Sequence, residues 1–378
     1  QLVPSILSRI LVKIPITQLP CRTATSITQL PDSMPLTDYI QAVPKAELHV
    51  HLEGTIQPET FLTLAKRNRV DLPYQTLEEL RQWFQFSDFH HFIDVYVAIT
   101  QSLLTMEDFE LIVHEYGAEM ARQNIRYAEV TFSPSNHKWI NGVSEDVYFT
   151  GITNGRNAVK KEFGVEINWV FDLVRNGYPN DEKMDYVTQV AIDGMQDGVV
   201  AIGLGGLETG YPPEPFEPWF DRALAAGLRS APHAGELGGP ESIWGAVRAL
   251  KAERIGHGVR AIEDPHLVAY LAEHRIPIEV NPTSNICLGV YESLEPHPLR
   301  KLHDAGVIVT VNSDDPPLFN TTLNEEAVLL ASTFGFPLET IDEILLNGIR
   351  HSFLDIDRKQ TFEASFLEEM AGLKDNYL

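Results

Sequence analysis

From residue 44 onward, two hydrophobic patterns alternate along the chain. Each repeat begins with a short apolar, β-branched run that ends in polar residues, as buried parallel strands do. A longer segment with apolar residues at helical spacing follows, and Gly or Asn closes it before the next strand. The pattern predicts eight strands, at Glu47–His51, Tyr127–Phe132, Glu166–Asp172, Val199–Leu204, Arg229–His233, Arg254–His257, Pro277–Val280 and Val307–Asn312.

The segments between these strands carry helix end signals. Thr105, with Asp108 three residues later, resembles a capping box, and apolar residues follow at helical spacing until Asn124. Asp264 followed by Pro265 is typical of an N-cap and the first helical position. Helices therefore alternate with the predicted strands.

Eight strand–helix units in one chain predict an α/β fold, a parallel (β/α)8 TIM barrel with extra helices after the first strand. A doubly wound open sheet is the alternative. Nearly every predicted strand ends in polar residues, which favours the barrel, because an open sheet gathers its site near one switch point. Residues 34–378 show no break in composition, so we expect a single domain.

Residues 1–33 differ from the rest of the chain. They contain three basic residues and one acid, with many Ser, Thr and Pro residues, and Ile16–Pro20 recurs as Ile27–Pro31. Few acids and scattered bases are typical of a transit peptide, whereas Met34 stands just before the patterned region. We favour a disordered or non-native extension and begin the fold at residue 34.

Composition limits the classes of partner. The chain has 378 residues, with 29 Lys and Arg against 53 Asp and Glu, for a formal net charge of −24. Such a surface repels nucleic-acid phosphates and anionic membranes, which favours a small-molecule substrate. No apolar run approaches the roughly 20 residues of a spanning helix. The two cysteines, Cys21 and Cys287, form no Cys-x-x-Cys pair, which fits a cytoplasmic location. The oligomeric state stays open.

Four residues at strand ends have the chemistry of metal ligands. His49 and His51 are one residue apart, so a strand would direct both imidazoles to one face. His233 ends the fifth strand and Asp314 follows the eighth. Each alone has a structural explanation, such as a hydrogen-bonded core histidine or a turn aspartate. Together, three imidazoles and one carboxylate suit Zn²⁺ and would help a water molecule lose its proton near neutral pH.

Three further residues have the chemistry of catalysis. Glu236, three residues after His233, is a candidate general acid and base, with a helix N-terminal carboxylate as the alternative. His257 ends the sixth strand between two glycines and could stabilise charge. Asp315 neighbours Asp314 and would project differently, toward a substrate. The glycines near Gly206 would let backbone N–H groups approach a flat ring.

These motifs together resemble the adenosine deaminase family of zinc-dependent aminopurine deaminases. The resemblance covers residues 38–355 and is specific as a set, although each piece alone is not. The pieces occur in the family's order, at Lys45–Gly54, Gly203–Glu208, His233–Glu236, Arg254–Gly258, Asn281–Asn285 and Asn312–Pro316.

The resemblance implies one Zn²⁺ per chain, bound by His49, His51, His233 and Asp314. It also implies how the substrate is handled: Glu236 would exchange a proton with purine N1, and His257 would orient the attacking oxygen. Asp315 would contact N7, and the Gly206 amide would contact N3. The reaction would replace the 6-amino group by oxygen and release ammonia. The same ligands can hold iron or manganese.

The resemblance leaves the substrate open among 6-aminopurines. We expect a nucleoside such as adenosine, within purine metabolism, although members acting on adenosine usually carry Asp at the positions of Glu53 and Gly203. Members acting on free adenine tend to share Glu53 but usually have Ser-Ser in place of Gly205 and Gly206. The segment from Gly205 to Pro213 resembles the subgroup that deaminates 6-aminodeoxyfutalosine in menaquinone synthesis.

Two other classes of protein are disfavoured. A silent purine-binding barrel would not need Glu236 and His257 beside a metal site. A polynucleotide deaminase would carry His-x-Glu and Pro-Cys-x-x-Cys motifs, which this chain lacks.

Overall fold

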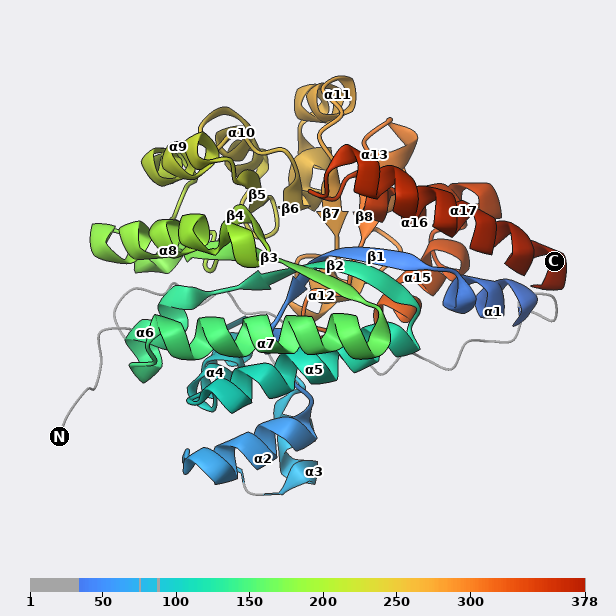
Figure 1. Ribbon diagram of the computed structural model, residues 1–378. Coiled ribbons are helices and arrows are strands. Elements are labelled where there is room, and N and C mark those ends of the chain that lie inside the picture. The colour runs from blue at the N-terminus through green and yellow to red at the C-terminus, as the bar shows by residue number, and fades with distance from the viewer. Residues whose placement is uncertain (1–33, 75, 87–88, 378) are drawn as a thin grey trace.

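The structure is a computed structural model that describes residues 34–74, 76–86 and 89–377, so the prediction for residues 1–33 lies outside the described residues. Eight parallel strands, paired in chain order, surround a nearly closed barrel (Figure 1). The predicted (β/α)8 fold is confirmed, and each predicted strand overlaps an observed one. The strands are β1 Lys45–His51, β2 Ile125–Phe132, β3 Glu166–Val174, β4 Val199–Gly205, β5 Arg229–Ala234, β6 Ile255–His257, β7 Ile278–Val280 and β8 Val309–Val311.

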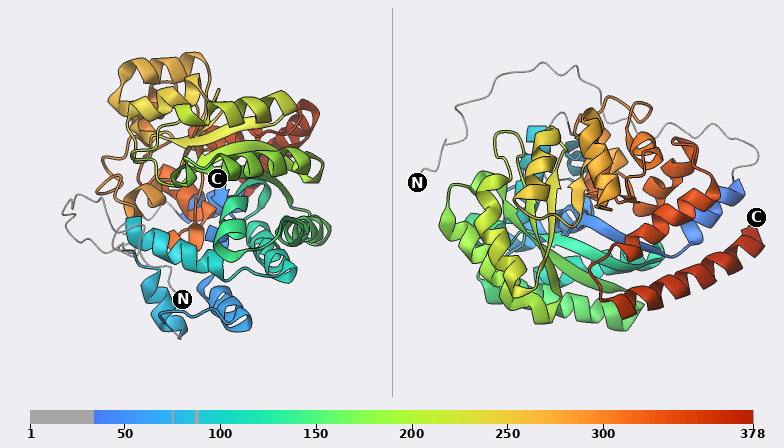
Figure 2. Two further views of the ribbon diagram at one scale, coloured as in Figure 1. Left: turned by 90° about the vertical axis from the view of Figure 1, so that its left-hand side faces the viewer. Right: turned by 90° about the horizontal axis from the view of Figure 1, so that it is seen from above.

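Helices surround the barrel on its outer side (Figure 2). They are α1 Met34–Ala42, α5 Met106–Arg122, α6 Pro134–Asn141, α7 Glu145–Phe163, α8 Asp181–Asp193, α9 Glu217–Ala226, α10 Pro240–Arg248, α11 Pro265–Glu273, α12 Pro282–Cys287, α13 Leu299–Asp304, α14 Pro316–Phe319, α15 Leu323–Ser332, α16 Leu338–Arg350 and α17 Ile356–Tyr377. Three more, α2 Pro58–Asn68, α3 Leu77–Trp83 and α4 Phe89–Gln101, lie between β1 and α5, and α2 and α3 project from the body. The predicted extra helices after the first strand are confirmed.

The predicted helix ends have clear physical causes. The Thr105 amide donates to Asp108 Oδ2 at 2.7 Å, which starts α5, and Asn124 follows its end with a φ of 57°. Asp264 accepts a hydrogen bond from the His266 amide at 2.9 Å and caps α11.

The last strands of the barrel are shorter than the first ones, and the closure next to β1 uses a side chain as well as backbone groups. Strands β1 to β4 have seven to nine residues, whereas β6, β7 and β8 have three each. Beyond β8, the His51 amide donates to the Asp314 carbonyl at 2.9 Å, and the Asp314 amide donates to the His49 carbonyl at 3.1 Å. A side chain takes part as well, because Asn312 Oδ1 accepts from the Leu48 amide at 2.9 Å. Closure therefore places Asp314 directly beside the two histidines of β1.

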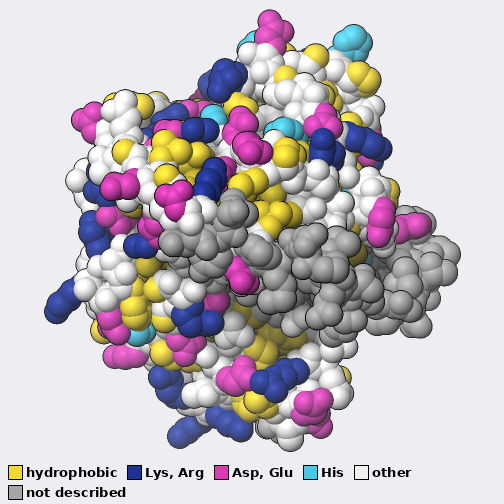
Figure 3. Space-filling model, turned by 90° about the vertical axis from the view of Figure 1, so that its right-hand side faces the viewer, with side chains coloured by type: hydrophobic (Ala, Val, Ile, Leu, Met, Phe, Trp, Pro, Cys, Tyr) yellow, Lys and Arg dark blue, Asp and Glu magenta, His cyan; other side chains and the backbone are white. Residues whose placement is uncertain are grey.

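One face of the molecule shows how the charged side chains are distributed. On the face shown in Figure 3, acidic and basic side chains are interspersed over the described part of the chain. Among the residues that the structure describes, no helix combines the length and apolarity that a membrane span requires.

Candidate active site

Four histidines and two aspartates converge where the carboxyl ends of the strands meet. His49 and His51 come from β1, His233 from β5 and His257 from β6. The imidazole ring centroids of His49 and His233 are 4.5 Å apart, and those of His49 and His257 are 4.8 Å apart. Asp314 and Asp315 follow β8 into the same place. This is the end of a (β/α)8 barrel at which catalytic residues collect.

The spacing of the donor atoms fits one metal ion. Nε2 of His51 lies 3.1 Å from Nε2 of His233 and 3.3 Å from Oδ1 of Asp314. Nε2 of His49 lies 3.4 Å from the same Asp314 oxygen. Donors at Zn²⁺ distances in a tetrahedron are roughly 3.3 Å apart. His49 Nε2 is buried without a hydrogen-bond partner among the described residues, as expected for a nitrogen that binds a metal ion.

His257 also belongs to the potential metal cluster. One set of donor atoms within 4.8 Å of one another comprises His49, His233, His257 and Asp314, and further sets join His51 to its neighbours. The residues present are therefore able to hold a metal ion, and more donors converge than four ligands require.

Two of these residues are held in strained backbone conformations. His257 has a φ of 60° and Asp314 a φ of 64°. Side chains other than Gly rarely adopt this left-handed region, and such strain is concentrated at functional sites. The conformation turns each side chain out of the regular strand direction and into the cluster.

A chain of buried charges orients His49. Its Nδ1 lies 3.0 Å from Glu279 Oε2, and Glu279 accepts from Arg254 Nε at 2.5 Å. Arg254 also donates to Glu129 at 2.6 Å. Burial opposes the charge on Glu279, but Arg254 and His49 hold its pKa below the ordinary value. Contacts of this kind fix the tautomer and orientation of a metal-binding histidine. The sequence motifs contained Arg254 without revealing this role.

The motif Asn281–Asn285 supports Asp314 and His257. Ser284 Oγ donates to Asp314 Oδ2 at 2.6 Å. The amide groups of Asn281 and Asn285 lie 3.3 and 3.2 Å from His257 Nδ1. An amide nitrogen at this distance can donate to Nδ1, which favours the tautomer of His257 that carries its hydrogen on Nε2. Burial lowers the pKa of His257 to about 3, so the ring is neutral with an N–H directed into the site.

Glu236 lies across from His257. Its Oε1 is 3.7 Å from His257 Nε2. Burial, reinforced by the charges of Asp314 and Glu208, raises the pKa of Glu236 to about 8. The carboxyl group is therefore protonated at neutral pH, as a general acid must be.

Glu208 holds the loop that carries Glu236. Its two carboxylate oxygens accept, at 2.6–3.1 Å, the backbone N–H groups of Gly235, Glu236, Leu237 and Gly238. The loop is thereby fixed before any substrate binds. The sequence placed Glu208 in a motif but gave no sign of this contact, because the partner loop is 27 residues away.

Asp315 occupies a space that only glycine leaves free. A Cβ atom on Gly54 would lie 1.8 Å from Asp315 Oδ1. Burial and the adjacent Asp314 raise the pKa of Asp315 well above its ordinary value, which favours the protonated form that can donate a hydrogen bond. Gly206, directly after β4, has a φ of 84°, which favours glycine.

Glu53 is buried and engaged by protein groups. Its Oε1 lies 2.8 Å from His137 Nε2, and its Oε2 accepts from the Tyr96 hydroxyl at 3.2 Å. The contact with His137 helps to lower the pKa of Glu53, against the effect of burial. His137 follows a strand end but showed no site pattern in the sequence, and only the structure places it against Glu53.

Asp172 is the residue of the cluster that sequence reasoning missed. Its Oδ2 lies 4.0 Å from His233 Nδ1, and its side chain is 2% exposed. Burial raises the pKa of Asp172 to about 7, although His51 and His49 oppose that shift. The available signal was a lone carboxylate in the apolar run of the third predicted strand.

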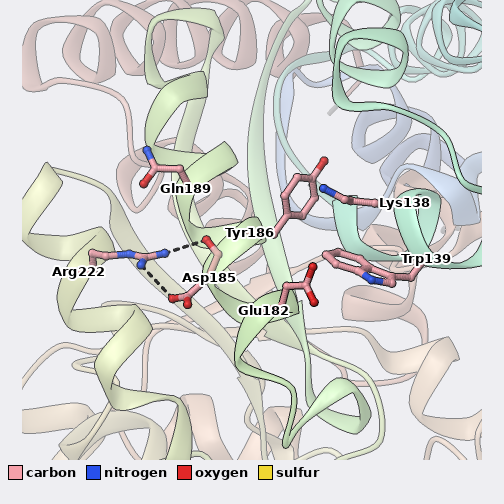
Figure 4. Close-up of a pocket in the computed structure, with 7 residues that line it drawn as sticks. All are labelled: Lys138, Trp139, Glu182, Asp185, Tyr186, Gln189 and Arg222. Atoms are coloured by element: carbon pink, nitrogen blue, oxygen red, sulfur yellow. Dashed lines mark hydrogen bonds and ion pairs between the residues drawn. The ribbon is translucent and has the colours of Figure 1, made fainter.

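A separate surface hollow lies among α6, α8 and α9 (Figure 4). Arg222 donates to Asp185 at 3.0 Å there, and Lys138 Nζ lies 3.6 Å from the Tyr186 ring centroid. The hollow shares no residue with the histidine cluster.

Comparison with known proteins gives consistent results. The family described as adenosine deaminase matches residues 44–368. Aminodeoxyfutalosine deaminase of Streptomyces avermitilis is 42% identical over 331 residues, which cover 87% of this chain and 92% of the relative. Adenine deaminase of Albidiferax ferrireducens is 36% identical over 342 residues, or 90% of this chain and 97% of the relative.

Solved structures agree with the fold. The crystal structure of adenine deaminase from Arthrobacter aurescens matches with a TM-score of 0.82 and 35% identity, covering 88% of this chain and all of that chain. An amidohydrolase from Burkholderia ambifaria with bound Zn matches with a TM-score of 0.85 and 28% identity, covering 93% of this chain and 96% of that chain.

Proposed function

The chain belongs to the adenosine deaminase family and is a metal-dependent hydrolytic deaminase of the aminopurine type, and we propose that its substrate is 6-aminodeoxyfutalosine. This adenine nucleoside has a bulky 5′ extension. One water molecule would add at C6 and ammonia would leave, so that an oxygen replaces the 6-amino group. The expected substrate class, a 6-aminopurine nucleoside, is thereby narrowed to one member.

The relatives carry the choice of substrate. Two aminodeoxyfutalosine deaminases from Streptomyces species are each 42% identical to this chain, whereas adenine deaminases are 34–39% identical. The Gly205-Gly206 pair at the end of β4 supports the same choice. Each oxygen of Glu53 already has a protein partner, so Tyr96 and His137 fix the orientation of its carboxylate.

We assign the metal ion as one Zn²⁺, held by His49, His51, His233 and Asp314. When bound, it supplies Lewis-acid activation of water. The neutral His257 is better suited to donate its Nε2 hydrogen to the attacking oxygen than to complete the ligand set, because both its Nδ1 partners favour that tautomer.

The remaining residues hold the purine and move the proton. Glu236, protonated at neutral pH, would donate to N1 as the attacking oxygen adds at C6. The Glu236 carboxylate would then take one proton from that oxygen and pass it to the amine, which leaves as ammonia. The oxygen would give its second proton back to Glu236 as it becomes the C6 carbonyl. Protonated Asp315 would donate to N7, and the Gly206 amide would donate to N3. In each of these roles the donated hydrogen belongs to a protein group, either the carboxyl group of Glu236 or Asp315 or the backbone amide of Gly206.

The experiment compares three substrates on one preparation. Metal-loaded protein is given 6-aminodeoxyfutalosine, adenosine and adenine, and kcat/KM for ammonia release is measured for each. The proposal predicts the highest value for 6-aminodeoxyfutalosine. A higher value for adenine would favour the second candidate, free-base deamination, which the adenine deaminase relatives and Glu53 support. Turnover of none of the three would contradict the proposed function itself.

A further inference from the structure

The side chain of Asp172 on β3 reaches past the neighbouring strand β4 to a histidine on β5. Asp172 lies on β3, and in the parallel register it pairs with Gly203 of β4, which in turn pairs with Ala231 of β5. His233, two residues further along β5, is nevertheless 4.0 Å from Asp172 through its Nδ1. Side chains on strands separated by another strand come this close only if the intervening strand leaves room.

Two glycines of β4 provide that room. A Cβ atom on Gly203 would lie 1.9 Å from Asp172 Oδ1, and one on Gly205 would lie 2.4 Å from Oδ2. Both carboxylate oxygens therefore occupy positions that any other residue type would fill. Neither glycine has a positive φ, so the need for glycine at both positions comes from this side chain and not from the backbone.

The two groups that face each other are both unsatisfied. His233 Nδ1 and one Asp172 oxygen, Oδ1, are buried without a hydrogen-bond partner among the described residues, and the other oxygen, Oδ2, is the one that lies 4.0 Å from Nδ1. The other nitrogen of His233, Nε2, points at His51 Nε2 in the metal cluster. A histidine that binds metal through Nε2 carries its hydrogen on Nδ1 and needs an acceptor for it.

We propose that Asp172 is a positioning residue for His233, accepting the Nδ1 hydrogen across the gap left by Gly203 and Gly205. The assignment of His233 as a metal ligand belongs to the proposed function. Asp172 acts on the reaction only through that ligand. An acidic side chain at residue 203 of β4 could occupy the same place. This chain has Gly203 there, and Asp172 of β3 supplies the carboxylate.

The test moves the carboxylate from one strand to the other. Four variants are compared with wild type: Asp172→Asn, Asp172→Ala, and Asp172→Ala combined with either Gly203→Asp or Gly203→Asn. The affinity for Zn²⁺ is measured by competition with a chromophoric chelator, and the visible spectrum of the Co²⁺-loaded protein reports ligand geometry. Thermal melting without metal shows whether each variant folds.

We expect Asp172→Asn to bind Zn²⁺ about tenfold or more weakly, because it keeps the shape and removes the charged acceptor. Gly203→Asp should restore affinity and the Co²⁺ spectrum to Asp172→Ala, whereas Gly203→Asn should not. Wild-type affinity in Asp172→Asn would overturn the proposal, as would equal rescue by Asn. If the double variants fail to melt cooperatively, Asp172→Asn decides alone.

Other outcomes separate this proposal from the proposed function. A raised KM with unchanged metal affinity in Asp172→Asn would assign Asp172 to the substrate and overturn the positioning role. Wild-type protein that fails to bind Zn²⁺ would instead contradict the proposed metal centre.

Discussion

The two sides of the candidate metal centre support their histidines differently. On the β6–β7 side, His49 is bonded to Glu279, and the contact continues through Arg254 to Glu129, all of them buried. On the β3–β4 side, His233 Nδ1 lies 4.0 Å from Asp172 Oδ2, and Asp172 Oδ1 has no hydrogen-bond partner among the described residues. The cation on this side, Arg175, donates instead to the His233 carbonyl oxygen at 2.6 Å.

The difference separates a fixed side from an adjustable one. Each link on the His49 side is a charge-assisted hydrogen bond, so the imidazole is oriented before any metal binds. The contact between His233 and Asp172 is too long for a hydrogen bond, so Asp172 does not fix the imidazole in the same way. We infer that the His49 side sets the position of the metal and that the His233 side adapts to it.

The largest effect is expected from Glu236→Gln. This change removes the transferable proton but keeps the size of the side chain, so kcat for the best of the three substrates should fall about 10²–10⁴-fold. Metal content should stay at the wild-type value, because Glu236 lies outside both histidine supports. Glu241→Gln, an exposed carboxylate at the start of α10, is the matched control and should leave kcat unchanged. Wild-type turnover in Glu236→Gln would contradict the proton-transfer role.

Arg254→Met should break the fixed side. It leaves Glu279 and Glu129 buried without their cation, which typically costs about 3–5 kcal/mol in the free energy of unfolding. Arg229→Met is the control, because Arg229 also lies over the Phe353 ring but pairs with Glu253 at the surface. An exposed pair contributes about 0–1 kcal/mol. Urea denaturation measures both, and equal losses would contradict the importance of the buried network.

Glu279→Gln and Asp172→Asn compare the two sides directly. Loss of the partner that orients a metal-binding histidine typically weakens metal binding about 10–100-fold. We expect Glu279→Gln near the upper end of that range and Asp172→Asn near the lower end. Glu273→Gln, an exposed change on α11, should match wild type. Chelator competition measures all three, and a larger effect for Asp172→Asn would reverse the assignment of the fixed and adjustable sides.

The smallest change is in the pH profile of the unmodified enzyme. Burial raises the pKa of Glu236 to about 8, and the protonated form is the proton donor. The value of kcat/KM should therefore hold near neutral pH and decline as the pH rises through about 8. Stopped assays in overlapping buffers measure this limb. A decline centred near pH 5 would show that Glu236 is not the titrating acid.

Much of the fold was predictable because strand and helix patterns are local. All eight strands follow from apolar periodicity and end signals, and the shared strand ends predicted that His49, His233 and Asp314 would meet. The ends of β6 to β8 were less predictable, because side chains such as Asn312 replace backbone bonds there.

The contacts that orient the histidines could not be predicted from the sequence, because they join side chains that are far apart along the chain. Glu279 is 230 residues from His49, and nothing in either local pattern links them. Asp172 was not recognised for another reason. Its contact with His233 is possible only because Gly203 and Gly205, on a different strand, have no side chains.

The most direct measurement is ammonia release from 6-aminodeoxyfutalosine as Zn²⁺ is added back to metal-free protein, with bound zinc measured on the same samples. A metal-dependent deaminase with one site per chain predicts that turnover rises in proportion to bound zinc and levels off at one ion per chain. Turnover that is unchanged by metal removal, or absent at full loading, would contradict the account.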